Sequence, residues 1–236
     1  MSTSSSCRKT DAASFCVAGK SASDSGDYPV VAVELVPGSF RMSIPDRSNP
    51  VYTIDVAVTD DDIRKTFEMR YGEFCVNMNS LPPEDYPDHI ETDEFDRDAV
   101  HFIARYRGNP VGCFRVIFPG TKPYLMERGP DGFKIESWFP RNTSCELSRM
   151  VGKRIIDPEI GEIWQSELLY AAVCYWCVEH GFTHWAFAIR ERFFDRLRQL
   201  EWPFFPLSPP RMYHGIVAYP VIVNLHDFLR ILLLRK

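Results

Sequence analysis

The sequence has little of what marks a nucleic-acid-binding, membrane-embedded or secreted protein. Its 236 residues carry a formal net charge of −5, so they lack the basic surface that nucleic-acid binding usually needs. The longest apolar runs, such as GIVAYPVIVNL and FLRILLL, are too short or carry charge, so no segment is expected to span a membrane. The first residues do not join a basic region to an apolar run, as a secretory signal does. We therefore expect a cytoplasmic protein that does not bind nucleic acid.

The cysteines and histidines lack the spacing of a disulfide framework or a metal site. Seven cysteines, an odd number, are scattered along the chain, which is typical of reduced thiols. Cys174 and Cys177 form a C-x-x-C pattern inside an apolar run without a second pair, so we interpret them as core residues of a helix. His180 and His184 flank Gly181, a predicted helix end, and so would not share a helical face. We expect no metal and no bound cofactor.

Composition divides the chain into three parts. Residues 1–28 are rich in Ser, Ala and Asp, which predicts a disordered N-terminal tail. Residues 29–50 hold a short strand-like run followed by prolines and turn formers, and we interpret them as an extended segment or linker. Residues 51–236 are long enough to bury one large core and are predicted to form a single domain.

Within residues 51–236, strand and helix patterns follow one another in a mixed order. Thr59 and the acidic residues after it predict the start of a helix over 59–76. Two runs, 99–107 and 111–118, flank a Gly-Asn-Pro turn and predict a hairpin. The other predicted elements are strands at VYTIDVAV, SCELSRMVGK, FTHWAFAIR and MYHGIVAYPVIVNL, the last broken by Pro220, and helices within IIDPEIGEIWQSELLYAAVCYWCVEHG and ERFFDRLRQLEW. This order indicates an α+β domain with a mixed central sheet flanked by helices.

The stretch CELSRMVGKR places two charges inside an otherwise apolar strand. Residues three apart in a regular strand point to opposite faces, so at least one of Glu146 and Arg149 should face the covered side of the sheet. A charge there is costly unless it is paired. Glu146 is therefore either a general base, acting directly or through a water, or a structural partner in an ion pair.

Four motifs in order, MRYGEFCV, ETDEFD, GCFRVIF and CELSRMV, resemble the autoinducer-synthase branch of the GNAT acyltransferases. That branch contains acyl-homoserine-lactone synthases and long-chain N-acyl amino acid synthases. The resemblance is strongest to the second kind and to the related acyltransferases that accompany PEP-CTERM/exosortase systems. It covers about residues 51–236 and implies a GNAT-like (acyl-CoA N-acyltransferase-like) fold.

The resemblance also implies a linked cluster of charged residues beside an amine-acceptor site. Carried over by position, Glu146 and Arg149 are the catalytic residues, and the backbone near Met150 and Val151 stabilises the oxyanion. The substrate-binding residues that the resemblance implies are Arg70, Phe74, Asp93, Asp96 and Arg115. Lactone synthases carry a Trp shortly after the Phe, where this chain has Ser80. Its absence favours an amino acid or a related amine over S-adenosylmethionine as acceptor.

The segment after the central strand bears on which acyl donor and which protein partner the enzyme would use. Coenzyme A users carry a Gly-rich pyrophosphate loop there, whereas VGKRIIDPEIGEI has its two glycines nine residues apart with Pro158 between them. This favours acyl carrier protein, with its phosphopantetheine thioester, as donor. An acidic carrier would need a basic landing patch. The candidates for that patch are Lys153, Arg154, Arg190 and Arg192. The closing DFLRILLLRK is predicted to dock on the domain as a helix, although it could also touch a membrane surface.

These observations predict an N-acyltransferase that moves a fatty acyl group from acyl carrier protein to the amine of an amino acid or similar small acceptor by direct aminolysis. One alternative is an acyl-homoserine-lactone synthase that uses S-adenosylmethionine. An alternative of another class is a non-catalytic GNAT-fold module that binds an acylated partner or serves regulation. No pattern in the sequence indicates an oligomeric state.

Overall fold

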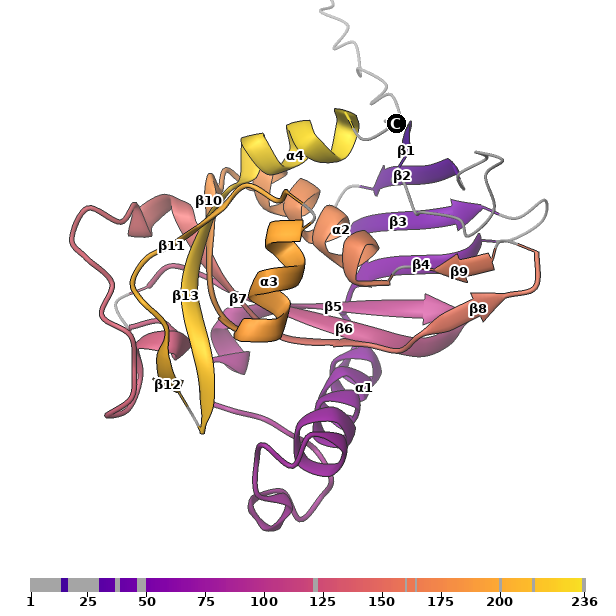
Figure 1. Ribbon diagram of the computed structural model, residues 1–236. Coiled ribbons are helices and arrows are strands. Elements are labelled where there is room, and N and C mark those ends of the chain that lie inside the picture. Colours follow the sequence, from indigo (N-terminus) through magenta and orange to yellow (C-terminus); the bar gives the residue numbers. More distant parts are fainter. Residues whose placement is uncertain are drawn as a thin grey trace, which may run out of the picture.

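The computed structural model describes residues 14–16, 30–36, 39–45, 50–120, 123–159, 161–163, 165–199, 201–213 and 215–234 (Figure 1). The α-helices in these segments are α1 (Asp60–Arg70), α2 (Gln165–Glu179), α3 (Glu191–Gln199) and α4 (Leu225–Leu234), and the π-helix η1 (Tyr71–Asn77) continues α1. The strands are β1 (Ser14–Cys16), β2 (Val30–Val36), β3 (Ser39–Pro45), β4 (Pro50–Val56), β5 (Ala99–Tyr106), β6 (Asn109–Ile117), β7 (Ser144–Gly152), β8 (Ile155–Asp157), β9 (Gly161–Ile163), β10 (His184–Arg190), β11 (Phe204–Pro206), β12 (Arg211–Tyr213) and β13 (Ile216–Asn224).

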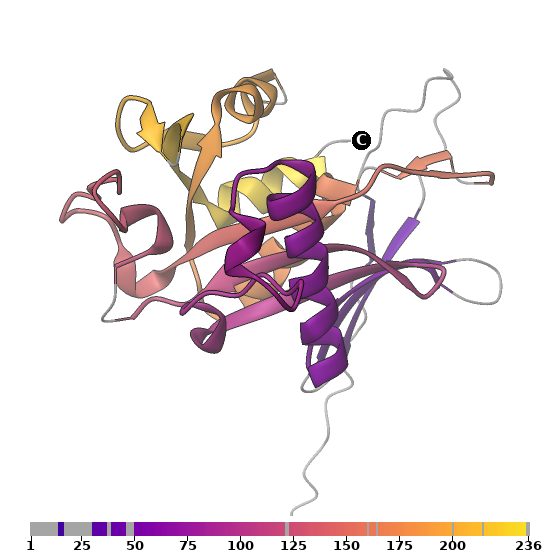
Figure 2. The same cartoon turned by 90° about the horizontal axis from the view of Figure 1, so that it is seen from below.

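Most strands belong to one mixed sheet with helices on both faces, which confirms the predicted fold class. The strand order is β1-β2-β3-β4-β5-β6-β7-β10-β13-β11, and β12 also pairs with β13. Only β7 and β10 pair in parallel among the described strands, and β8 and β9 form a separate two-stranded ribbon. α1 lies on one face of the sheet and α2 and α4 on the other (Figures 1 and 2). α3 shares the α2 face, because Phe193 stacks on Tyr170 of α2.

Pairing between β7 and β10 stops soon after it begins. The paired residues are Ser144 with His184, Cys145 with Trp185 and Glu146 with Ala186. Beyond this point β10 and β13 turn steeply away from β5 and β6 (Figure 1). The second half of β7 therefore lacks a strand partner on its β10 side, and the sheet opens there. Parallel strands that separate leave backbone groups free for a ligand at the opening.

A β-bulge changes which way the side chains of β7 point. Cys113 pairs with Val151 and Arg115 with Ser148, so two residues of β7 oppose the single residue Phe114. The extra residue is Arg149, whose φ of 53° lies in the left-handed region. The bulge places Arg149 on the same face as Glu146. The expectation for a regular strand, with the two charges on opposite faces, is therefore wrong for this one.

The core has one part on each face of the sheet. The larger part packs the α2 face against α2, α3 and α4, and it includes Cys174 and Cys177, as predicted from their apolar surroundings. The smaller part lies on the opposite face of β10 and β13, where the segment 123–143 covers the sheet. Its buried members are Tyr124, Met126, Phe133, Phe139, Ala186, Ala218 and Ile222.

Several local predictions are confirmed. The hydroxyl of Thr59 accepts a hydrogen bond from the Asp62 N–H at 3.1 Å and caps α1. The predicted hairpin is β5–β6. Gly181 has a φ of 81° just after α2, as expected of a residue that ends a helix. No helix among the described residues is both long enough and apolar enough to cross a membrane.

Two predicted breaks are continuous strands. β3 occupies part of the predicted linker over 29–50, because pairing with β2 and β4 on both sides outweighs its weak strand pattern. Pro220 does not interrupt β13. Its C=O accepts from the Leu207 N–H at 2.8 Å, on the edge where β13 has no pairing between β11 and β12, so no partner needs the N–H that proline lacks. Most of the predicted tail over 1–28 lies outside the described residues, and β1 is the part of it that pairs with the sheet.

Gly112 on β6 is a test of how closely β6 and β7 pack. A Cβ there would lie 2.8 Å from the Val151 carbonyl oxygen and 2.8 Å from Oε1 of Gln165. We expect Gly112→Ala to lower the free energy of unfolding by about 1–3 kcal/mol, measured by denaturant titration. Gly72→Ala is the control, because a Cβ there meets nothing within 4 Å and alanine favours a helix. Equal losses in both variants would contradict this packing.

Candidate active site

Six charged side chains form a closed ring of alternating sign, which we call the charge ring. Its links, by the shortest printed ion-pair distance, are Arg70–Glu91 at 2.5 Å, Glu91–Arg149 at 3.0 Å, Arg149–Asp93 at 3.4 Å, Asp93–Arg115 at 2.6 Å, Arg115–Asp96 at 2.6 Å and Asp96–Arg70 at 2.6 Å. Three guanidinium groups face three carboxylates, so the ring is neutral as a whole.

Different elements supply the two kinds of charge. Arg70 ends α1, Arg115 lies on β6 and Arg149 is the bulge residue of β7. The carboxylates all come from the loop segment 91–96, which the ring binds to the sheet. The side chains of Arg70 and Arg115 are at most 1% exposed. Buried cations of this kind require hydrogen-bonded partners, which explains the acidic loop sequence.

The ring keeps its carboxylates ionised. Burial alone would raise the pKa of Asp96, but hydrogen bonds and charges of Arg70 and Arg115 outweigh it and lower that pKa to about 2. The pKa values of Glu91 and Asp93 are also lowered, because the arginines around them outweigh the effect of burial. None of these three carboxylates is therefore suited to take a proton near neutral pH.

Glu146 lies on the same face of β7 but in a different environment. Its carboxylate accepts the N–H of Leu125 at 2.5 Å and that of Met126 at 2.9 Å, in a short 3-10 turn of the segment 123–143. The residue is 2% exposed. Burial raises its pKa to about 8, although the two N–H groups and Arg115 act in the opposite direction. The charged partners of Arg149 are Glu91 and Asp93 instead of Glu146.

One aromatic side chain lies beside the charge ring and another beside the turn that binds Glu146. The guanidinium of Arg149 lies 5.3 Å from the ring centre of Phe74 on η1. Tyr213 of β12 donates its hydroxyl hydrogen to the Leu125 carbonyl oxygen at 3.1 Å. Burial raises the pKa of Tyr213 to about 12, the charge of Glu146 adds to this and Arg149 opposes it. Both charges therefore act on Tyr213, which lies on the same side of the sheet.

Two residues of this site, Glu91 and Tyr213, were not predicted. Glu91 is fully buried and bridges Arg70 to Arg149. A count of charge could have found it, since three arginines in one buried cluster need a third carboxylate once Glu146 is not their partner. No local pattern distinguishes Tyr213, because only the fold brings β12 to this place.

The remaining predicted residues lie around the opening between β7 and β10. Met150 packs against the main core, and Val151 follows it on β7. The four basic residues predicted to contact a carrier protein are exposed. Lys153 and Arg154 follow β7, and Arg154 forms an ion pair with Glu162 of β9 at 2.9 Å. Arg190 ends β10 and Arg192 lies in the first turn of α3.

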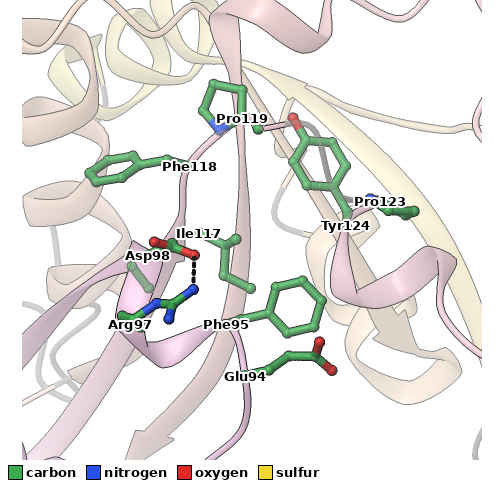
Figure 3. Close-up of a pocket in the computed structure, with 11 residues that line it drawn as sticks. Glu94, Phe95, Arg97, Asp98, Ile117, Phe118, Pro119, Pro123 and Tyr124 are labelled. Atoms are coloured by element: carbon green, nitrogen blue, oxygen red, sulfur yellow. Dashed lines mark ion pairs between the residues drawn. The ribbon is translucent and has the colours of Figure 1, made fainter.

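A pocket of about 470 Å³ adjoins the site (Figure 3). Phe95, between the two aspartates of the charge ring, forms one wall, and Tyr124, which precedes the Glu146-binding turn, lies across from Ile117. The Arg97–Asp98 ion pair borders the opposite side. The lining is thus mainly apolar and aromatic, with Arg97 and Asp98 on one side and Glu94 beside Phe95. Within the described residues no group of three or more His, Cys, Asp or Glu side chains is arranged to hold a metal ion.

Comparison with protein families gives a match, and it falls on the segment that carries this site. Residues 69–154 match the family model of the acetyltransferase (GNAT) domain, and this segment contains the charge ring and Glu146. A comparison with curated proteins gives no match. The match and the fold support an acyltransferase enzyme of the GNAT type.

Among solved structures the chain is similar to three synthases of small acylated products. BjaI, a CoA-dependent acyl-homoserine lactone synthase, is 21% identical over 73% of this chain and 81% of its own, with a TM-score of 0.58. The acyl-homoserine lactone synthase LasI is 14% identical over 78% and 94%, with a TM-score of 0.59. FeeM, an N-acyl amino acid synthase from uncultured soil microbes, is 12% identical over 78% and 95%, with a TM-score of 0.58. The resemblance to the autoinducer-synthase branch is therefore confirmed at the level of the fold.

The ring predicts a large effect of a small change at Glu91. Glu91→Gln leaves two buried or part-buried guanidinium groups with one charge partner fewer, so we expect a loss of about 3–5 kcal/mol in the free energy of unfolding. Denaturant titration measures it. Glu68→Gln is the control, because Glu68 pairs with Arg64 on the exposed face of α1 and surface pairs contribute little. A Glu91 variant as stable as the wild type would contradict the ring.

The raised pKa of Glu146 predicts that its contribution to the free energy of unfolding falls as pH rises, which is the opposite of what a carboxylate with a lowered pKa does. Between its ordinary pKa of 4.5 and about 8, the unfolded chain loses the proton while the folded protein keeps it. Stability from this group is therefore full below about pH 4.5 and falls as pH rises, by roughly 1.4 kcal/mol per unit of pKa shift. Glu146→Gln should remove this fall, so the variant gains on the wild type between pH 5 and 8. Parallel stability curves for the two proteins over that range would refute the raised pKa.

Proposed function

We propose that this protein is an N-acyltransferase that moves a fatty acyl group from the thioester of acyl carrier protein to the amine of an amino acid or similar acceptor. The observation that carries the proposal is that two carboxylates on the same side of the sheet have pKa values shifted in opposite directions. Asp93 has a lowered pKa and stays ionised, whereas burial raises the pKa of Glu146 to about 8. Neighbouring acids with separated pKa values are typical of a site that both binds a cation and removes a proton.

Glu146 is suited to accept the proton of the acceptor ammonium. The ammonium of a free amino acid is a weaker acid than a chain-terminal α-amino group, whose pKa is about 7.7–8. A carboxylate whose pKa is about 8 is therefore a better matched proton acceptor than one at the ordinary value of 4.5. Each carboxylate oxygen accepts one backbone N–H, which leaves a second lone pair on each for the proton, directly or through a water. The other interpretation is that Glu146 only anchors the segment 123–143 to β7, and it makes a different prediction for the pH profile.

The reaction is direct aminolysis. After the ammonium has lost one proton, the neutral nitrogen attacks the thioester carbonyl carbon. The carbon–sulfur bond breaks, an amide forms, and the second proton that the nitrogen loses leaves on the sulfur as the free thiol. The N–H groups near Met150 and Val151 are our candidates for stabilising the oxyanion, since they lie where β7 has lost its β10 partner. The same opening would admit the phosphopantetheine arm.

Three features support a carrier protein as donor. The connection from β7 to α2 contains the β8–β9 ribbon, and Gln165, the first residue of α2, is buried with its side chain near β6 and β7. This leaves no Gly-rich turn at that helix end for a pyrophosphate. The exposed Lys153, Arg190 and Arg192 would meet an acidic carrier. BjaI, a structural neighbour, is a CoA-dependent enzyme, so both donors belong in the test.

Lactone synthesis from S-adenosylmethionine is the second candidate, because the fold is shared with BjaI and LasI. Ser80 stands where the lactone-synthase pattern has Trp, and its hydroxyl donates to the Phe74 carbonyl oxygen at 3.1 Å. A small hydroxyl side chain there offers no aromatic surface to an adenine, which favours the amino acid acceptor.

The assay combines purified protein with acyl carrier protein or coenzyme A thioesters of several chain lengths, and with amino acids or S-adenosylmethionine. Mass spectrometry should detect N-acyl amino acids formed from the carrier-bound donor. Acyl lactones would favour the second candidate, and no acylated amine from any donor would favour the non-catalytic module.

The pH profile decides the role of Glu146. We expect wild-type kcat/KM to rise as Glu146 loses its proton near pH 8, and Glu146→Gln to lose this rise together with most of the activity, about 10²–10⁴-fold. Glu127→Gln is the matched control, since Glu127 stabilises the same segment from within, through Arg141 and the Tyr124 N–H, and lies outside the charge ring. If both variants lose activity and keep the same pH profile, Glu146 is an anchor only.

A further inference from the structure

Most of the charge ring is sealed from solvent. The side chains of Arg70, Arg115 and Glu91 are at most 1% exposed, and that of Asp96 is 9% exposed. These groups already neutralise one another and offer little or no surface to a small molecule. Only Arg149, at 18%, and Asp93, at 20%, expose a larger part of the side chain. A ligand can therefore meet the ring only at the link between these two residues.

That link is also the loosest one. Arg149 uses Nε and Nη2 to bind Glu91, at 3.0–3.1 Å, which is the side-on arrangement of a guanidinium on a carboxylate. Its contact with Asp93, from Nη2 to Oδ2, is 3.4 Å, the longest link of the ring. Nη1 makes no hydrogen bond within the part of the chain that the structure describes. The end-on edge of Arg149, formed by Nη1 and Nη2, is thus the unused side of the group.

Asp93 presents the complementary charge at the same place. Its Oδ1 accepts from Arg115 at 2.6 Å and from the Phe95 N–H at 2.9 Å. Its Oδ2 accepts from Arg115 at 2.9 Å and holds the long contact to Arg149. Oδ2 is therefore the oxygen with capacity for another donor. A cationic edge and an anionic oxygen meet at one exposed point, and one weak contact joins them.

We propose that this point binds the α-carboxylate and the α-ammonium of a free amino acid together. The carboxylate binds end-on to Nη1 and Nη2 of Arg149, and the ammonium binds Oδ2 of Asp93, so that the ligand replaces the 3.4 Å contact. A zwitterion keeps the neutral ring neutral, whereas an amine without a carboxylate adds a positive charge and leaves the edge of Arg149 empty. This inference rests on the proposed function and names the substrate class of that site.

The rest of the ring then serves to hold this pair in place. Glu91 fixes Arg149 from behind, Phe74 lies against its guanidinium, and the left-handed backbone of the bulge directs the side chain. Groups held by packing and hydrogen bonds before the ligand arrives lose little freedom on binding. Lysine would keep the charge at position 149, but its ammonium cannot bind Glu91 side-on and a ligand carboxylate end-on as a guanidinium can. It should therefore not substitute for arginine.

The test compares matched acceptors with matched variants. One α-amino acid, its carboxamide and its decarboxylated amine are assayed with wild type, Arg149→Gln and Arg149→Lys. We expect wild-type kcat/KM to be about ten- to a hundredfold higher for the acid than for the other two. Both variants should lose this preference to within a few-fold, while Arg64→Gln on the exposed face of α1 keeps it. A wild type that acylates all three acceptors equally overturns the proposal, whether or not the variants fold.

Calorimetric titration of the same compounds without donor separates the two hypotheses. Binding of the acid but not of the carboxamide to wild type, abolished in Arg149→Gln, supports the pair even if no acyl product forms and the proposed function fails. Product formation without any preference for a carboxylate leaves the proposed function standing and overturns the Arg149–Asp93 site. Loss of acid and carboxamide turnover in equal proportion in Arg149→Gln also overturns it.

Discussion

Burial of Arg70 and Arg115 is the constraint on which the site depends. A guanidinium group cannot lose its proton in a protein, so each must find carboxylates where it is buried. The loop segment 91–96 provides them, and it is therefore bound to the end of α1 and to the middle of the sheet. The long polar loop before it is fixed at its far end by these ion pairs. One electrostatic requirement thus places the helix, the loop and two strands relative to one another.

The bulge of β7 adds a second constraint, which is the face of the sheet to which the side chains of Glu146 and Arg149 point. A regular strand would turn either Glu146 or Arg149 toward the apolar α2 side, where neither charge has a partner. The extra residue brings both to the face of α1, and the loss of pairing with β10 opens the sheet beside them. The two charges then enter different environments. Arg149 joins the ring, whereas Glu146 is enclosed by the backbone of the segment 123–143.

The fold is shared with acyl-homoserine lactone synthases and with an N-acyl amino acid synthase, and one fold can carry several functions. The segment 123–143, the loop that carries Glu91 and the hairpin that carries Tyr213 together surround the face of β7 where the proposed acceptor site lies. The first two of these segments also contribute residues to the lining of the pocket, among them Phe95 and Tyr124. In the proposed function these connections select the acceptor, while β7 and its opening serve the acyl transfer.

Sequence patterns by themselves determined the α+β order, the cap at Thr59 and the β5–β6 hairpin, because periodicity, capping and turn signals are local properties. Most members of the charge ring were implied by the resemblance to a known family. Only the tertiary structure decided the rest. The bulge at Arg149, the continuity of β13 through Pro220 and the partnership of Glu91 depend on what neighbouring strands and loops offer. The environment of Glu146 is decided in the same way. Its burial under Leu125 and Met126, some twenty residues earlier in the chain, sets its pKa, and no local pattern encodes that contact.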